Sequence, residues 1–309
     1  MVSGENLGKL TFRQRVKRTC KRLFGGTGKE RAFNITLYAV FALFLVVMLS
    51  PFAYVIVESL KSKELVNDVP TQIWGFAAYQ AVLGGSESIL RTFLNTVFVT
   101  IFGTAFAVAL TTVGAYPLSR RNLKGRQFFL GYILVTMLFS GGLIPFYLLI
   151  RNVLQLTDSY WVYILIGGAG AFNVFIVKGY FQGISEELYE AAALDGAGEF
   201  RIFVSVYLPL SKPIIATIAL WIAVGKWNDY MTGLLYIKSS DKLLIQNTLR
   251  GMLSKASNTS GMGGGSDQMA LSESIKMAAV VVSLIPIMCV YPFVQKYFTK
   301  GVMLGSVKG

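Results

Sequence analysis

Six long apolar runs dominate this chain and limit what it can fold into. They are, in order, Asn34–Val57, Phe93–Leu118, Phe128–Ile150, Trp161–Val177, Pro213–Ile237 and Met277–Val294. Several approach the ~20 residues that a helix needs to cross ~30 Å of hydrocarbon. Because backbone groups in lipid must pair within their own segment, each run is predicted to be a helix. The sequence therefore predicts an all-α integral membrane protein with six transmembrane helices.

Composition narrows the chemistry. Of the 309 residues, 54% are hydrophobic and 15% are charged, and the net charge is +13. The basic residues flank the apolar runs, which favours contact with an anionic lipid surface over binding of nucleic acid. The chain has no histidine and two cysteines, Cys20 and Cys289. This excludes histidine-based catalytic triads and argues against a disulfide framework and a metal site.

The distribution of lysine and arginine predicts the orientation. Basic residues gather in the N-terminal segment, between Arg120 and Arg126, and in the C-terminal segment. With six spans these three regions lie on one side, which is the cytoplasmic side by the positive-inside rule. Both termini are therefore predicted to be cytoplasmic. The predicted division is a basic tail (1–33), a first span (34–57), an external loop (58–92), a five-helix core (93–294) and a cytoplasmic tail (295–309).

An acidic, alanine-rich segment lies in the predicted cytoplasmic loop 182–212. Ser185 is a plausible N-cap, and the two glutamates that follow it favour the positive end of a helix. Gly196 can adopt the left-handed conformation that ends a helix. A second short helix is predicted to run from Phe200 until Pro209 breaks it. The result is a helix-turn-helix with a small face that a groove on another protein could accept.

The spacing within this loop resembles the "EAA" signature of the permease subunits of bacterial ABC importers, with Val206 where isoleucine is usual. In that family the loop is a coupling helix that fits into the nucleotide-binding subunit. The resemblance assigns to the coupling loop the residues Glu190, Ala191, Ala192, Asp195, Gly196, Leu208 and Pro209.

Three further segments resemble the carbohydrate-uptake branch of these permeases, in particular the importers of complex oligosaccharides. They are Leu138–Pro145 in the third run, Trp227–Tyr230 in the fifth run and the terminal Gly301–Gly309. The resemblance implies a type I ABC importer permease fold in the bacterial plasma membrane. It also implies a second permease as a heterodimer partner, two cytoplasmic ATPase subunits and an extracellular solute-binding protein.

A glycine-rich segment, Gly25–Glu30, looks like a phosphate-binding loop but lacks two required residues. Leu23 stands where that loop needs glycine, and Glu30 stands where it needs serine or threonine. The chain is therefore predicted to bind no cofactor itself, and ATP with Mg²⁺ is expected on the partner ATPases.

Charged residues inside a span usually face a protein or water cavity. Lys226 and Asp229 are the only two in the predicted spans, and their i, i+3 spacing allows them to pair. The candidate substrate pathway comprises Asn173, Lys226, Trp227, Asn228, Asp229 and Tyr230. Two alternatives stay open: the fifth helix could end near Gly225, and Asn173 could bond a neighbouring helix. The small residues Gly167–Ala171 are explained by close helix packing.

Two other functions compete with an importer subunit. An ion-coupled secondary transporter would need a buried carboxylate relay and broken helices in paired repeats, which the sequence does not display. A membrane enzyme would need a catalytic constellation near the interface, and the chain offers no histidine, reactive cysteine or acidic pair for one. The sequence therefore favours a permease that is not an enzyme.

Overall fold

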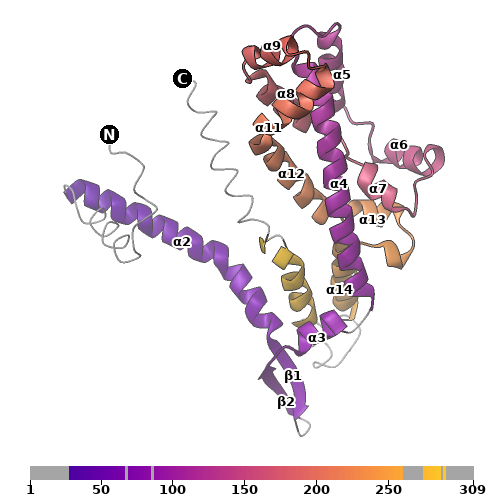
Figure 1. Cartoon of the computed structure of the whole chain (residues 1–309). Coiled ribbons are helices and arrows are strands. Elements are labelled where there is room, and N and C mark those ends of the chain that lie inside the picture. The colour runs from indigo at the N-terminus through magenta and orange to yellow at the C-terminus, as the bar shows by residue number, and fades with distance from the viewer. Residues whose placement is uncertain (1–27, 67–68, 85–86, 260–273, 287, 290–309) are drawn as a thin grey trace. The chain divides into compact units, whose positions relative to one another are not determined.

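The computed structural model describes residues 28–66, 69–84, 87–259, 274–286 and 288–289 (Figure 1). The chain divides into two compact units, Met1–Glu58 and Ser59–Gly309. The predicted N-terminal tail up to residue 27, the glycine run 261–266 and the tail 295–309 lie outside the described residues.

The first unit contains one long helix, α2 (Gly28–Ser59), whose last residue belongs to the second unit. Its segment Arg31–Ser59 is 29 residues long and apolar enough to cross a membrane. The prediction of a helix over Asn34–Val57 is confirmed. Apolar residues occupy every face of α2, as expected of a helix surrounded by lipid or protein.

The second unit begins with a small hairpin that the sequence analysis did not predict. Strands β1 (Lys61–Val66) and β2 (Val69–Trp74) pair antiparallel, with Lys61 opposite Trp74. Helix α3 (Ala77–Gly84) follows. The rule that excludes open strands applies only within hydrocarbon. A polar loop outside the membrane can satisfy its backbone by strand pairing, so the hairpin agrees with a helical membrane part.

Helix α4 (Glu87–Ser119) is the central helix of the second unit. It contains a candidate span of 31 residues, Ile89–Ser119, so the predicted second span is confirmed as a helix. At 1.5 Å per residue a helix of this size is about 50 Å long. It packs against α7 (Tyr160–Leu165), α8 (Ala171–Gln182) and α12 (Lys212–Trp227), as Figure 1 shows.

The third apolar run is not one helix. Helix α5 (Arg126–Leu138) is followed by α6 (Leu143–Leu148) and a π-helical turn, η2 (Leu149–Val153), at an angle of 108°. The expected continuous helix over Phe128–Ile150 is therefore wrong. The chain leaves α5 at Phe139, whose backbone is extended, and Gly142 just before α6 has φ 84°, a conformation that favours glycine.

The fourth run also breaks, between α7 and α8. Gly167 has φ 71° and lies in the segment that was expected to serve helix packing. That expectation holds at one neighbouring position. Gly168 is buried, and a Cβ added there would lie 3.0 Å from a ring carbon of Phe106 on α4. The small residues thus provide both a helix break and one close approach.

The fifth run ends its first helix, α12, at Trp227. Helix α13 (Met231–Tyr236) begins after three intervening residues, so the expected single helix over Pro213–Ile237 is wrong. A 3-10 turn, η4 (Ser240–Lys242), and helix α14 (Ile245–Thr259) follow in the predicted external loop. Of the sixth run, the described part is helical over Ser274–Pro286.

The described residues contain two helices that are long and apolar enough to cross a membrane, or up to four if each bent pair is one span. The second bent pair joins Glu199–Leu210 to Lys212–Trp227 at 81°. The described helices thus agree with an all-α membrane core, and the count of six spans stays a prediction.

Candidate functional site

The loop 182–212 forms the predicted helix-turn-helix. Helix α9 (Glu186–Leu194) starts after Ser185, although the Ser185 side chain makes no capping hydrogen bond. Gly196 has φ 79° and follows the end of α9, as the sequence predicts. The second part runs through α10 (Glu199–Ile202), a π-helical turn η3 (Phe203–Tyr207) and α11 (Leu208–Leu210). The break falls at Ser211, two residues after Pro209.

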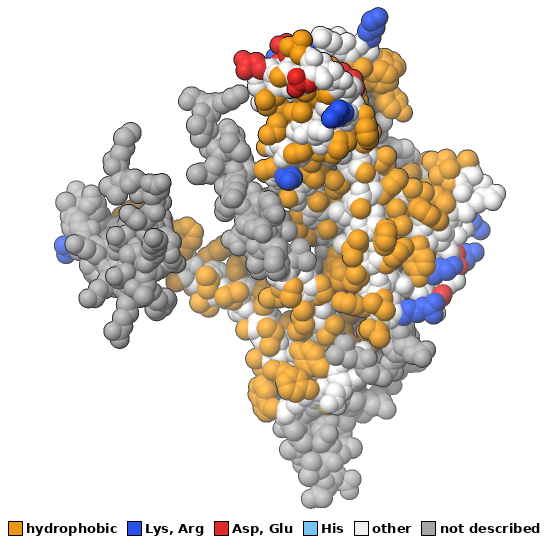
Figure 2. Space-filling view, in the orientation of Figure 1, with side chains coloured by type: hydrophobic (Ala, Val, Ile, Leu, Met, Phe, Trp, Pro, Cys, Tyr) orange, Lys and Arg blue, Asp and Glu red, His pale blue; other side chains and the backbone are white. Residues whose placement is uncertain are grey.

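The tip of this loop presents exposed acidic and apolar side chains together. Leu194 is 89% exposed and Phe200 is 78% exposed. Acidic side chains gather over the same end of the molecule in Figure 2; they include those of Glu186, Glu187 and Asp195. Large apolar side chains exposed to water are unfavourable in the isolated subunit. A patch of this kind is typical of a surface that another protein covers. Ala192 is half-buried and packs against the core beneath the loop.

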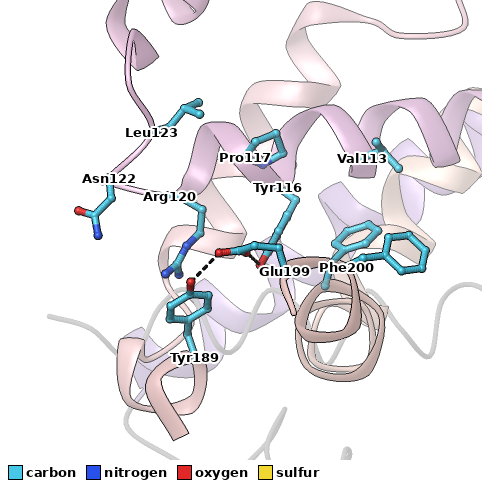
Figure 3. Close-up of a pocket in the computed structure, with 10 residues that line it drawn as sticks. Val113, Tyr116, Pro117, Arg120, Asn122, Leu123, Tyr189, Glu199 and Phe200 are labelled. Atoms are coloured by element: carbon cyan, nitrogen blue, oxygen red, sulfur yellow. Dashed lines mark hydrogen bonds between the residues drawn. The ribbon is translucent and has the colours of Figure 1, made fainter. Parts of the chain in front are cut away.

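A carboxylate fastens this loop to α4. Glu199 Oε2 accepts a hydrogen bond of 2.7 Å from the Tyr116 hydroxyl of α4, and Glu199 Oε1 accepts one of 2.6 Å from the Tyr189 hydroxyl of α9. Figure 3 shows Glu199 between the two phenols. The hydrogen bond to Glu199 raises the pKa of Tyr189 above its ordinary value. One side chain therefore joins three helices.

Arg120, the residue just after α4, reinforces the same junction. Its guanidinium carbon lies 3.4 Å from the centroid of the Tyr189 ring, and its Nη1 donates a hydrogen bond of 2.8 Å to the Tyr207 hydroxyl. In the sequence, Arg120 is one of the basic residues whose distribution predicts the orientation. Its partners are 69 and 87 residues further along the chain, so no local pattern could reveal them.

A pocket of about 550 Å³ lies beside this junction (Figure 3). Its walls combine apolar groups of Val113, Pro117 and Phe203 with the polar groups of Tyr116 and Glu199. The junction around Glu199 is therefore packed where Tyr116, Tyr189 and Arg120 meet, and it borders an open pocket.

The side chain of Lys226 is packed against neighbouring helices and does not line an open pathway. Its side chain is buried, and its amine donates to the carbonyl oxygens of Tyr163 and Ile166, the latter at 2.7 Å. These carbonyls are freed where α7 ends. Asp229 Oδ1 instead accepts a hydrogen bond of 3.0 Å from the Thr232 N–H at the start of α13. The expected Lys226–Asp229 ion pair does not form in the described part of the chain.

The other pathway candidates separate into two places. Trp227 is buried, donates to the Ser283 carbonyl at 3.2 Å and packs edge-on against Phe93. Asn228 accepts a hydrogen bond from Gln246 of α14 at 3.2 Å. The fifth helix thus ends within two residues of Gly225, which was the alternative left open.

Tyr230 lies at the start of α13, where its carbonyl accepts a hydrogen bond of 2.9 Å from Asn247. Asn173 is half-buried on the first turn of α8. It lies beside Gly170, whose added Cβ would be 3.4 Å from its Nδ2. The structure therefore brings Asn228 and Tyr230 together with α14 and leaves Asn173 apart from them.

The far end of α4 is tied to the loops that follow α13. Asn95 Nδ2 donates to the Asp241 and Leu243 carbonyls at 2.8 and 3.1 Å, and the Ile245 N–H donates to Thr96 Oγ1 at 2.9 Å. Hydrogen bonds from Ser239 and neighbouring groups hold the pKa of Asp158 well below its ordinary value. Hydrogen bonds therefore tie this end of α4 to the loops after α13, at the end of α4 away from loop 182–212.

Comparison with known proteins decides between the possible kinds of transporter. Residues 112–304 match the family described as binding-protein-dependent transport system inner membrane components. The chain belongs to this family. It is therefore a permease and not an enzyme, as the sequence predicts.

Individual members of the family resemble the chain over most of its length. It is 43% identical to the polygalacturonan/rhamnogalacturonan transport system permease protein YtcP of Bacillus subtilis, over 91% of this chain and 100% of YtcP. It is 41% identical to the protein LplC of the same organism, over 84% of this chain and 89% of LplC.

A solved structure shares the fold. It is the crystal structure of a bacterial ABC transporter involved in the import of the acidic polysaccharide alginate, with 31% identity and a TM-score of 0.76. The match covers 88% of this chain and 99% of that chain. The ABC importer permease fold implied by the "EAA" resemblance is thus confirmed.

Proposed function

We propose that the chain is the permease subunit of an ABC importer that carries an oligosaccharide across the bacterial plasma membrane. The names of its relatives support the substrate class. YtcP is named for polygalacturonan and rhamnogalacturonan, and the structural relative is described as an alginate importer. The observation that carries the mechanism is the exposed helix α9, which is fastened to the central helix α4 through Glu199.

Helix α9 is the coupling element in this proposal. The coupling loop comprises Glu190, Ala191, Ala192, Asp195, Gly196, Leu208 and Pro209. Its small alanines allow close approach of an ATPase groove, and its carboxylates can bond basic or amide groups there. When the ATPase moves α9, the bonds from Tyr189 and Tyr116 to Glu199 carry that displacement to α4. The far end of α4 then moves the loops that hold Asn228 and Tyr230.

The partners follow from this division of labour. The importer contains a second permease, two cytoplasmic ATPases that use ATP and Mg²⁺, and an extracellular solute-binding protein. Both family membership and the failed phosphate loop at Gly25–Glu30 support placing ATP on another chain.

The proposed topology has six spans with both termini in the cytoplasm. Two spans are α2 and α4. The third, fourth and fifth cross as broken helices, and Ser274–Pro286 begins the sixth. Breaks are tolerated at membrane depth where neighbouring protein groups satisfy the freed backbone, as Lys226 does for α7. The division into tail 1–33, span 34–57, loop 58–92, core 93–294 and tail 295–309 belongs to the same proposal.

Reconstitution tests this function. The chain, its partner permease, the ATPases and the binding protein are placed in proteoliposomes, and uptake of labelled trigalacturonate is followed. We expect uptake that requires enclosed Mg-ATP on the ATPase side and the binding protein on the other. Uptake driven by a sodium or proton gradient without ATP would instead establish the ion-coupled alternative.

A further inference from the structure

A second pocket lies at the end of the molecule opposite the coupling loop. It has a volume of about 310 Å³ and opens to the surface between α13 and α14, with Tyr230, Asn247 and Arg250 among its walls. This size falls at the lower limit of small-ligand pockets. Because the proposed topology puts the coupling loop in the cytoplasm, this pocket lies on the outer side.

Arg250 contacts this pocket through the ring of Tyr230, and this contact leaves its N–H donors available for a ligand. Its guanidinium carbon lies 4.2 Å from the centroid of the Tyr230 ring, so the cation stacks on the aromatic group. Stacking uses the flat face of the guanidinium, whereas its five N–H donors lie in the plane. Arg250 is exposed and makes no hydrogen bond or ion pair to any described residue.

Two neighbouring cations at the same end are compensated. Arg91 forms an ion pair of 3.0 Å with Asp241, and Lys242 forms one of 3.3 Å with Asp158. The charge of Arg250 has no such carboxylate among the described residues. The Asn247 side chain meanwhile fixes the Tyr230 backbone through its bond of 2.9 Å. The pocket therefore presents a positioned positive charge that a ligand could neutralise.

We propose that this pocket is a subsite for a uronate unit of the transported oligosaccharide, with Arg250 binding the carboxylate. This inference rests on the proposed function and names the charge of its substrate. A guanidinium binds a carboxylate through two parallel charge-assisted hydrogen bonds, and the hydroxyl groups of a neutral sugar carry no charge to match it. The polymers named for YtcP and for the alginate importer both contain uronate units. Arg250 thus selects acidic over neutral oligosaccharides.

The test compares trigalacturonate with its methyl ester, in which each carboxylate is replaced by an uncharged ester group. Binding of each is measured by titration of the complete transporter without the solute-binding protein, which removes that protein's own selectivity. We expect Arg250→Gln to weaken binding of trigalacturonate about tenfold, because the charge-assisted hydrogen bonds to the carboxylate are lost. Binding of the ester should change less than about twofold, and Arg250→Lys should bind the acid with intermediate affinity.

Arg151→Gln is the matched control. Arg151 is also exposed, and its Nη1 donates a hydrogen bond of 3.2 Å to the hydroxyl of Tyr147. This substitution should leave binding of both probes unchanged. Equal loss of both probes in Arg250→Gln, no loss of either, or no binding of trigalacturonate to the wild-type transporter would overturn the subsite. Failure of the wild-type importer to take up any oligosaccharide would instead count against the proposed function.

Discussion

The hydroxyl of Tyr116, near the end of α4, donates a hydrogen bond of 2.7 Å to the carboxylate of Glu199, which is 83 residues further along the chain. The same carboxylate accepts the Tyr189 hydroxyl of α9. Because each of its oxygens bonds a different helix, Glu199 links the two elements that must move together if α9 is driven by an ATPase. This link lies outside the signature that identifies the loop.

Tyr116→Phe should lower the amount of oligosaccharide imported per ATP hydrolysed by several fold. The substitution removes a hydrogen bond worth about 1 kcal/mol and leaves the ring packing intact. Uptake and ATP hydrolysis are measured in the same proteoliposomes. Tyr132→Phe is the control, because Tyr132 is 63% exposed on α5. Unchanged coupling in Tyr116→Phe would show that Glu199 does not transmit movement.

Gly196→Val should weaken retention of the ATPase during purification while permease abundance in the membrane stays normal. Gly196 has φ 79°, and nothing lies within 4 Å of an added Cβ, so the cost of roughly 1 kcal/mol or more comes from backbone strain. Gly198→Val provides a matched control, because Gly198 has φ −70° and equal space around it. Equal retention in both variants would contradict the coupling role.

Ala192→Trp should disturb docking by displacing α9, and not by backbone strain as at Gly196. Ala192 is half-buried under the loop, so a large side chain must displace α9 from the core. We expect loss of uptake together with loss of co-purified ATPase. Normal uptake with full ATPase retention would defeat the assignment of α9 as the coupling helix.

Lys226→Met should lower thermal stability of the detergent-solubilised permease. The substitution keeps the apolar stem but leaves the Tyr163 and Ile166 carbonyls without the amine, at a cost of about 1–3 kcal/mol. The midpoint of thermal unfolding measures the effect. Unchanged stability combined with a raised half-saturating substrate concentration would return Lys226 to the substrate pathway.

Labelling of engineered cysteines checks the topology. In a variant without Cys20 and Cys289, a membrane-impermeant reagent added outside should modify Ser240→Cys and not Asn122→Cys. Both positions are exposed, so accessibility within the subunit does not decide the result. The reverse pattern would contradict cytoplasmic termini.

Features with local causes could be predicted from the sequence. Helix α9 ends before Gly196 because glycine accepts φ 79° without strain, and the signal lies within a few residues. Apolar runs likewise predict α2 and α4. Hydropathy could not predict the breaks at Gly142 and Gly167, because a run stays apolar whether or not its helix is continuous.

Site residues with distant partners could not be assigned from spacing. Lys226 and Asp229 are spaced to pair, yet the carbonyls freed at the end of α7 compete for the lysine. A carbonyl left unbonded away from water costs free energy, and Asp229 finds another partner in the Thr232 N–H. The partner of Lys226 is therefore set by the end of α7, a different helix. The spacing of residues within α12 carries no information about that end.

The polar bonds at the two ends of α4 have a consequence for mechanics. Asn95 is joined to the Asp241 carbonyl at one end and Tyr116 to Glu199 at the other. The two residues are 21 positions apart, which is about 32 Å along a helix. An unbroken helix between two fixed attachments behaves as a stiff rod under torsion. A twist applied beside α9 would therefore reach the outer loops at once, while the adjoining broken spans absorb the displacement at their glycine joints.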